Sequence, residues 1–298
     1  MFSRTLTTLA LIGMLASLTA CTGTTTAMDA AIRQPQATAT ARTDTDLPDH
    51  IVNGGFDYPD MGMLGARDSL FVYISRKDLS YARKDTQDKA NPADPPRSAL
   101  PSGFDASGFA WHSTQGNTGL ANEKTDDVQV WTAYDGGNHY AELAAAQTGT
   151  AIYQDIATRP GAMYKIRLKH TSLSKDHVDS IRVLVGPAGH GTPVVMTRTT
   201  ANGNGDRTGV SSTLIATKAS NAAEQNFSSR DHKGQWETYE GTYLIPAGQT
   251  VTRFTFESVS GKDLNHGNLL DDISFQLAYP LAYQENGSTR GNTPRQQQ

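Results

Sequence analysis

The sequence has few of the residues that make disulfide frameworks and thiolate metal sites. Cys21 is the only cysteine among 298 residues, which excludes an intramolecular disulfide and a zinc site built from several cysteines. A large surplus of charge of one sign is also lacking, since the chain has 26 Lys and Arg and 30 Asp and Glu. Without a basic surplus, we expect no nucleic-acid partner.

Long apolar runs are confined to the N-terminus. Residues 6–20 form an apolar stretch that is too short to span a bilayer and has the length of a signal-peptide core. It ends in Leu18-Thr19-Ala20-Cys21, which resembles the lipobox of bacterial lipoproteins. We therefore predict a lipoprotein signal peptide over residues 1–20, lipidation of Cys21, and an extracytoplasmic, lipid-anchored position at the bacterial cell membrane. The alternative is an ordinary secretory signal with a chance cysteine.

Composition divides the rest of the chain into a tether, one domain and a tail. Residues 21–50 are rich in Thr and Ala without a hydrophobic period, so they are predicted to be a disordered tether. Residues 51–283 carry strand patterns and form the predicted single domain. Within it, residues 60–108 and 196–233 are expected to be long loop insertions, either functional or decorative. Residues 284–298 are polar and are predicted to be a disordered tail.

Alternation with a period of two is the dominant pattern of the domain. Apolar residues occupy every second position in residues 164–170, 253–257 and 273–277. Residues 181–185 are nearly all apolar, which predicts a central strand buried on both faces. Short strands separated by turn signals, without a capped helical period, predict an all-β fold: an antiparallel β-sandwich or jelly roll.

Six segments, in order along the chain, resemble motifs of the galactose-binding-like β-sandwiches, which include many carbohydrate-binding modules. The segments are Asn53-Gly54-Gly55-Phe56-Asp57, Asp127-Val128-Gln129-Val130-Trp131, Tyr140-Ala141-Glu142-Leu143, Ile152-Tyr153-Gln154-Asp155, the set Trp236, Tyr239, Gly241, Tyr243 and Pro246, and Asn268-Leu269-Leu270-Asp271-Asp272-Ile273. The combination is similar to modules of surface proteins and adhesins of Gram-positive bacteria. The resemblance implies the sandwich fold and an extracellular ligand, most simply a glycan, without specifying which one.

The resemblance also implies a place for a metal ion. In such sandwiches the first and last strands lie side by side, which would bring Asp57 near Asp271 and Asp272. Carboxylates and backbone carbonyls are the ligands that Ca²⁺ prefers, so a structural calcium site is expected at these three residues. Asp57 stands where the family more often has the longer Glu. The alternative is that Asp271 and Asp272 only form a turn and a strand end.

Motifs for catalysis are not found in the sequence. No pair of carboxylates is singled out for glycoside hydrolysis, no Gly-x-Ser-x-Gly elbow is present, and the histidines lack the spacing of zinc ligands. We therefore expect a protein that is not an enzyme. An enzyme whose site is assembled from the two long insertions is the alternative.

Aromatic side chains beside a Gly-rich loop are the candidate ligand site. Sugars are bound by aromatic faces together with a few planar polar groups. Trp131, Tyr134 and His139 flank such a loop and are predicted to bind the ligand, although Trp131 could instead fill the core. The hypothesis is a non-catalytic cell-surface lipoprotein that binds a glycan. The alternative is a structural or adhesive module whose partner is a cell-envelope or host surface protein.

Overall fold

The computed structural model describes most of the predicted domain, namely residues 47–67, 69–85, 97–119, 123–131, 138–143, 147–174, 177–200, 208–218, 236–264 and 266–279. The chain divides into two units, Met1–Ala41 and Arg42–Gln298, and every described residue belongs to the second. The signal peptide, Cys21, Tyr134 and the tail lie outside the described residues. Within the described part, no helix has the length and apolar character needed to cross a membrane.

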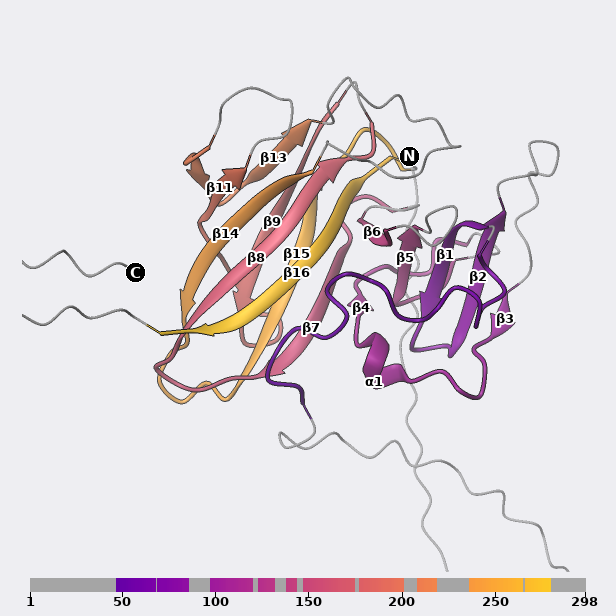
Figure 1. The fold of residues 1–298 in the computed structure, drawn as a ribbon, viewed down its shortest axis with the longest axis horizontal. Coiled ribbons are helices and arrows are strands. Elements are labelled where there is room, and N and C mark those ends of the chain that lie inside the picture. The colour runs from indigo at the N-terminus through magenta and orange to yellow at the C-terminus, as the bar shows by residue number, and fades with distance from the viewer. Residues whose placement is uncertain are drawn as a thin grey trace, which may run out of the picture. The chain divides into compact units, whose positions relative to one another are not determined.

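Nearly all regular structure in the described residues is β-strand, arranged in two antiparallel sheets (Figure 1). The strands of the larger sheet are β1 (Ser69–Ser75), β2 (Ser80–Asp85), β3 (Ser98–Ala99), β5 (Asp127–Trp131), β6 (Tyr140–Leu143), β8 (Met163–Ser172), β11 (Met196–Thr200), β12 (Ser211–Ser212), β14 (Glu237–Leu244) and β16 (Asn268–Ala278). They lie in the order β12-β11-β14-β8-β16-β6-β5-β1-β2-β3.

The smaller sheet contains β4 (His112–Ser113), β7 (Ala151–Ala157), β9 (Val178–Gly186), β10 (Thr192–Pro193), β13 (Ile215–Lys218) and β15 (Val251–Ser260). Its order is β10-β9-β15-β7-β4, and β13 also pairs with β9. The single described helix, α1 (Ala106–Phe109), begins at Asp105, whose side chain accepts a hydrogen bond from the Ser107 backbone.

The main hydrophobic core lies between the two sheets and takes alternate residues from their strands. Ile166 and Leu168 of β8 are buried in it, and Phe254 and Phe256 of β15 meet them from the smaller sheet. The ring of Phe275 in β16 lies 3.6 Å from that of Phe254, between ring centres. Burying one such side chain stabilises the fold by roughly 1.5–3 kcal/mol. The predicted antiparallel β-sandwich is confirmed.

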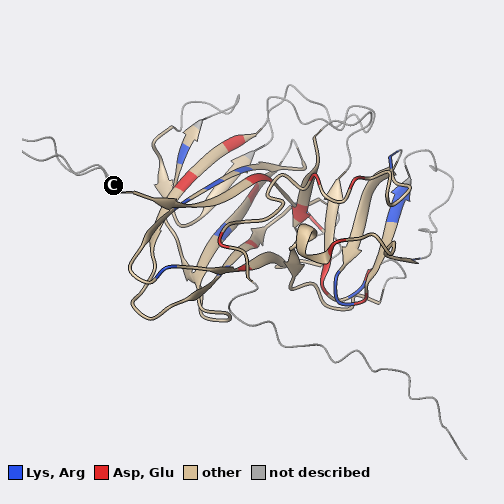
Figure 2. Ribbon diagram, turned by 60° about the horizontal axis from the view of Figure 1, so that its bottom comes forward, with Lys and Arg blue, Asp and Glu red and all other residues tan. Residues whose placement is uncertain are grey.

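The other face of β8 is charged and is balanced across the neighbouring strands (Figure 2). Lys165 Nζ lies 2.8 Å from Glu240 Oε2 on β14, and Lys169 Nζ lies 2.6 Å from Asp272 Oδ2 on β16. Such exposed cross-strand pairs each contribute only a few tenths of a kcal/mol. The lysines of β8 are the polar residues that alternate with its buried apolar residues, as the sequence predicts for this strand.

Strand β9 is not buried on both faces, which corrects the expectation for residues 181–185. Ile181, Val183 and Val185 are buried, but Arg182 and Leu184 are only half-buried. Arg182 Nη2 forms an ion pair at 2.7 Å with Glu257 Oε2 of β15. A strand of a two-layer sandwich has the core on one side only, so its second face does not need to be apolar.

The two segments that were expected to be loop insertions contribute strands to the sheets. Residues 60–108 contain β1, β2 and β3 as well as most of α1, and residues 196–233 contain β11, β12 and β13. β1 is apolar and pairs with β5 along its length. β2, of sequence SYARKD, is polar, and nothing in its own pattern indicates that it pairs with β1.

The fold also begins earlier than expected. Pro48 O accepts a hydrogen bond from the Ala157 backbone at 2.8 Å. Val52 is held from both sides by the Gln154 amide, which accepts from Val52 N at 3.0 Å and donates to Val52 O at 2.7 Å. Pro48, which was assigned to the tether, therefore contacts the end of β7.

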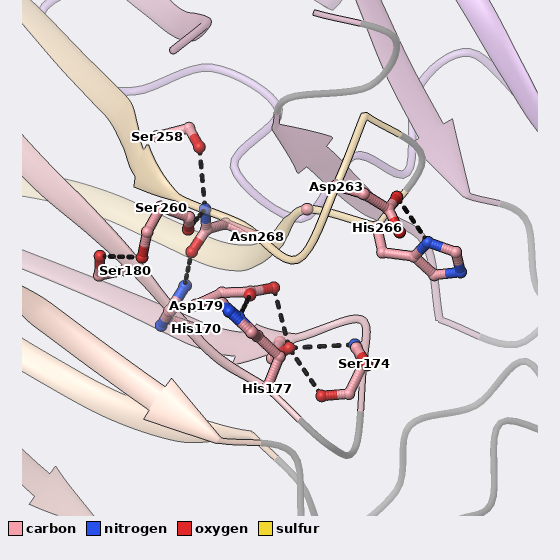
Figure 3. A network of polar contacts seen from close by, with 12 residues as sticks. His170, Ser174, His177, Asp179, Ser180, Ser258, Ser260, Asp263, His266 and Asn268 are labelled. Atoms are coloured by element: carbon pink, nitrogen blue, oxygen red, sulfur yellow. Dashed lines mark hydrogen bonds and ion pairs between the residues drawn. The ribbon is translucent and has the colours of Figure 1, made fainter. Parts of the chain in front are cut away.

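One end of the sandwich contains buried polar side chains that join the two sheets (Figure 3). His170 of β8 is fully buried, and its Nε2 donates to Asn268 Oδ1 at 2.8 Å. Its Nδ1 accepts from Thr217 of β13 at 2.9 Å. The Asn268 amide donates in turn to Ser258 Oγ of β15 at 3.0 Å. A register slip would leave these groups unpaired at about 1–3 kcal/mol each, so the network aligns the sheets.

The buried histidine predicts a dependence of stability on pH. Burial lowers the pKa of His170 to about 4, and the hydrogen bond that His170 donates to Asn268 acts in the opposite direction. The unfolded chain binds the proton at about pH 6.5, so stability is lost as the pH falls from about 6.5 to about 4. Between pH 7 and pH 4.5, urea denaturation is expected to show that the wild type loses about 2 to 3 kcal/mol more than His170→Gln. Equal losses in the two proteins would contradict this assignment.

Candidate functional site

The turn at the start of the domain contacts the last strand. Gly54 O accepts a hydrogen bond from Ile273 N at 3.0 Å. A Cβ atom on Gly54 would lie 1.8 Å from Ile273 O, so only glycine fits there. The contact falls where β16 shifts register against β8, between Asp271 and Ser274. The first segment of the domain therefore lies against the last strand, but as a turn. The expectation that the first and last strands lie side by side is wrong, because β5 and β6 separate β1 from β16.

Asp271 is the buried carboxylate of this contact. Its Oδ2 accepts from Asn138 Nδ2 and its Oδ1 from Asp272 N, both at 2.7 Å. Burial raises the pKa of Asp271 to about 6, and the two hydrogen bonds act in the opposite direction. The carboxylate of Asp272 instead pairs with Lys169 on the outer face of the sheet.

Asp57 lies close to Asp271 across Gly55. A Cβ atom on Gly55 would stand 3.2 Å from Asp57 Oδ2 and 4.0 Å from Asp271 Oδ1. Among the residues that the structure describes, no three His, Cys, Asp or Glu side chains gather as a metal site requires. Since Asp272 turns to Lys169, the three predicted ligands do not converge on one point. The present arrangement therefore does not fit a calcium ion held by all three.

His139 lies beside Asp57 and is mostly enclosed. Its side chain is 14% exposed, and its Nδ1 lies 3.6 Å from Asp57 Oδ1. Burial lowers the pKa of His139, and the neighbouring carboxylate opposes the shift. The ring therefore offers little surface to a ligand, and its role as a ligand-binding residue stays a prediction.

Strands β1, β5 and β6 carry aromatic side chains on the face opposite the main core. Val128 and Val130 of β5 belong to the core, whereas Trp131 belongs to a second cluster with Tyr140 of β6. The two rings are stacked at 6.2 Å with planes 12° apart. Because successive side chains of a strand point to opposite faces, one strand serves both clusters.

These rings belong to a longer series, which we call the aromatic row: Tyr73, Phe71, Trp131, Tyr140 and Trp236. Successive ring centres are 5.2, 5.4, 6.2 and 5.3 Å apart. Spacings of 4.5–7 Å are those of favourable aromatic pairs. Tyr73, Trp131 and Tyr140 are buried, while Phe71 and Trp236 are partly exposed. The row therefore reaches solvent at these two members.

A buried carboxylate holds the middle of the aromatic row in place. Glu142 accepts hydrogen bonds from Gln129 Nε2 at 2.8 Å, from Trp131 Nε1 at 2.7 Å and from Gly267 N at 2.8 Å. Burial raises the pKa of Glu142 to about 8, and the bonds from Trp131 and Gly267 act in the opposite direction. Trp131 is only 5% exposed, in keeping with the alternative that it packs inside the protein, and its role as a ligand-binding residue stays a prediction.

Two of the predicted ligand residues, Trp131 and His139, are therefore largely enclosed, and Tyr134 lies outside the described residues. Of the two partly exposed rings, Trp236 was named only as part of the resemblance, and Phe71 was not named. Phe71 could have been found from the run Leu70-Phe71-Val72-Tyr73-Ile74, in which both alternating faces are apolar. Such a strand needs apolar contacts on each side of its sheet.

Two adjoining clefts lie at the β4 edge of the smaller sheet. One has a volume of about 590 Å³ and reaches Pro48 and Asp105, and the other measures about 540 Å³ and reaches Tyr153. Arg76 and His112 line both. These two side chains therefore mark the boundary between the clefts.

His112 is neutral, as its partners require. Arg76 Nη1 lies 2.8 Å from His112 Nε2, and a guanidinium can only donate, so Nε2 accepts. The ring proton is then on Nδ1, which donates to Asp126 Oδ2 at 3.0 Å. One face of the ring stacks on Tyr153 with ring centres 5.4 Å apart. The guanidinium of Arg253 also lies over the Tyr153 ring, 4.0 Å from the ring centre.

No protein-family model matches the sequence, and no curated protein matches it. Among solved structures, a CBM4 structure is similar at 17% identity and a TM-score of 0.35, over 76% of this chain and 99% of that chain. The CBM22-1 xylan-binding domain from Paenibacillus barcinonensis is similar at 16% identity and 0.29, over 57% and 86%. The N-terminal cellulose-binding domain of Cellulomonas fimi β-1,4-glucanase C is similar at 14% identity and 0.28, over 58% and 91%. Likeness of this degree assigns neither a ligand nor a site to this chain.

The calcium prediction has a direct test in thermal melting. An ion that binds only the native state raises its melting temperature by mass action. About 10 mM calcium is roughly 10 to 100 times the Kd of typical extracellular calcium modules. If the ion binds, the melting temperature at that concentration exceeds the one in EDTA, and Asp271→Asn, which removes the buried charge beside Asp57, abolishes the difference. Superimposable melting curves of the wild type in calcium and EDTA would reject the site.

Proposed function

We propose that this protein is a non-catalytic, lipid-anchored cell-surface β-sandwich that binds a glycan at the aromatic row. The observation that carries the proposal is the placement of Tyr73, Phe71, Trp131 and Tyr140 on the sheet face that the main core does not use, with Trp236 packed against Tyr140. A sandwich needs only one apolar face for each sheet, so those members of a second apolar face that stay partly exposed are available to a partner.

The chemistry of the exposed members suits a saccharide. Phe71 and Trp236 are partly exposed and pack against the buried part of the second cluster. Flat rings of this kind receive the C–H faces of sugar rings, and buried neighbours hold them in fixed orientations. Trp131 and Tyr140 would supply that support, with Glu142 fixing the indole of Trp131. We therefore assign sugar contact to the two exposed rings and support to the buried ones.

Replacing the exposed rings by leucine tests this assignment. Phe71→Leu and Trp236→Leu keep an apolar side chain but remove the flat ring. Each is expected to weaken glycan binding about fivefold to tenfold, since one aromatic contact contributes on the order of 1 kcal/mol. A glycan array on the purified full chain would find the ligand, and calorimetry would then measure the affinities.

Tyr279→Leu is the matched control, because Tyr279 is 81% exposed and is not part of the aromatic row. It is expected to leave binding unchanged, and thermal melting would verify that all three variants fold. A folded wild type that binds no arrayed glycan would overturn the proposal and favour a protein partner. Undiminished binding by both row variants would reject the site.

The lipid anchor is tested separately from the ligand. Cys21→Ser, expressed in a bacterial host, is expected to lose incorporation of labelled palmitate and to leave the membrane fraction. Two or more acyl chains are needed for stable anchoring because each buried CH₂ contributes only about 0.8 kcal/mol. If the wild-type protein carries no labelled palmitate, the lipid anchor is rejected and residues 1–20 are an ordinary secretory signal peptide.

A further inference from the structure

The cleft of about 540 Å³ beside β4 combines two cations with one carboxylate. Arg76 and Lys77 come from the turn between β1 and β2, and Asp126 comes from the residue before β5. His112 also lines this cleft, and it is neutral because it accepts from Arg76. The local charge is therefore positive, although the whole chain has a formal net charge of −4.

The carboxylate of this cleft is already engaged on both oxygens. Asp126 Oδ1 accepts from Ser113 N at 2.6 Å, and Oδ2 accepts from His112 Nδ1 at 3.0 Å. Asp126 is therefore occupied by its own neighbours. What the cleft presents to a ligand is chiefly hydrogen-bond donors and positive charge.

A buried amide adds another donor. Gln115 lines the cleft and is only 5% exposed, and its Nε2 has no hydrogen-bond partner in the part of the chain that the structure describes. A buried amide donor without a partner costs about 1–3 kcal/mol. Such groups are rare in folded proteins and call for an explanation, of which a bound water, ion or ligand group is one.

We propose that this cleft is a second binding site, which takes an oxyanion group, a carboxylate or a sulfate, carried by an acidic saccharide. Gln115 Nε2 donates to the oxyanion, and the guanidinium of Arg76 and the ammonium of Lys77 supply the compensating charge. The site lies at the edge of the smaller sheet, whereas the aromatic row belongs to the larger one. It does not depend on a glycan binding at the row.

Calorimetry with three probes on the purified full chain tests the site: trigalacturonate, a sulfated disaccharide and neutral cellotriose. An acidic probe is expected to bind, and its affinity is expected to fall when NaCl is raised from 20 to 500 mM, because salt screens partly exposed charges. Whichever acidic probe binds more tightly identifies the carboxylate or the sulfate as the group recognised. Failure of both acidic probes to bind a folded protein would overturn the proposal.

Three variants locate the binding. Gln115→Glu places a like charge in the cleft and is expected to weaken binding of the acidic probe at least tenfold, while Gln115→Leu removes only the donor and should weaken it about fivefold. Lys77→Gln, an exposed position that leaves the fold intact, should weaken it about threefold. Lys262→Gln makes the same charge change in the connection between β15 and β16 and is expected to have no effect.

The two binding proposals fail in different ways. If Phe71→Leu abolishes binding of the acidic probe and the Gln115 and Lys77 variants do not, the acidic ligand binds at the aromatic row and the second site is rejected. If the acidic probe responds to Lys77→Gln and Gln115→Leu but not to Phe71→Leu, the second site stands, whatever becomes of glycan binding at the row.

Discussion

The alternation of side chains along β1, β5 and β6 is the constraint on which the candidate site depends. Val130 of β5 is buried in the main core, and its neighbour Trp131 points into the second cluster. The same strands therefore supply both faces of the larger sheet, and a one-residue slip would exchange them. Position on the sheet, more than residue type alone, encloses Trp131 and leaves Phe71 partly exposed.

Buried polar groups protect that register. Glu142 ties β5 to the segment just before β16 through Trp131 and Gly267, and His170 ties β8 to β13 and β16. A buried ion pair between Arg198 and Glu237 joins β11 to β14, and Tyr239 donates to the same carboxylate at 2.9 Å. Such groups add little net stability when they are paired but cost several kcal/mol when one partner is removed. They therefore select one alignment of the strands.

The alternating pattern of the sequence was sufficient to predict strands that pair in register with other long strands. The alternation in β8 and β15 predicted their buried faces, and the resemblance at Gly54 and Asp271 predicted that the two ends meet. It was insufficient for β2, which is polar and becomes a strand through its pairing with β1 and β3. It also failed for β9, since an apolar run does not reveal how many layers cover a strand. Gln115 carries no sequence signal, because its burial without a partner arises from residues distant in the chain.

The sequence by itself determined the class of fold, since alternation with a period of two and the lack of helical periods can bury apolar area only in paired sheets. Cys21 and the residues before it also led to the expectation of an extracytoplasmic, lipid-anchored location. Only the tertiary structure decided which aromatic rings are enclosed, that Asp272 turns to Lys169 away from Asp57 and Asp271, and that Arg76, Lys77 and Gln115 share one cleft. These outcomes depend on contacts between distant strands, and a one-dimensional pattern does not specify which strands become neighbours.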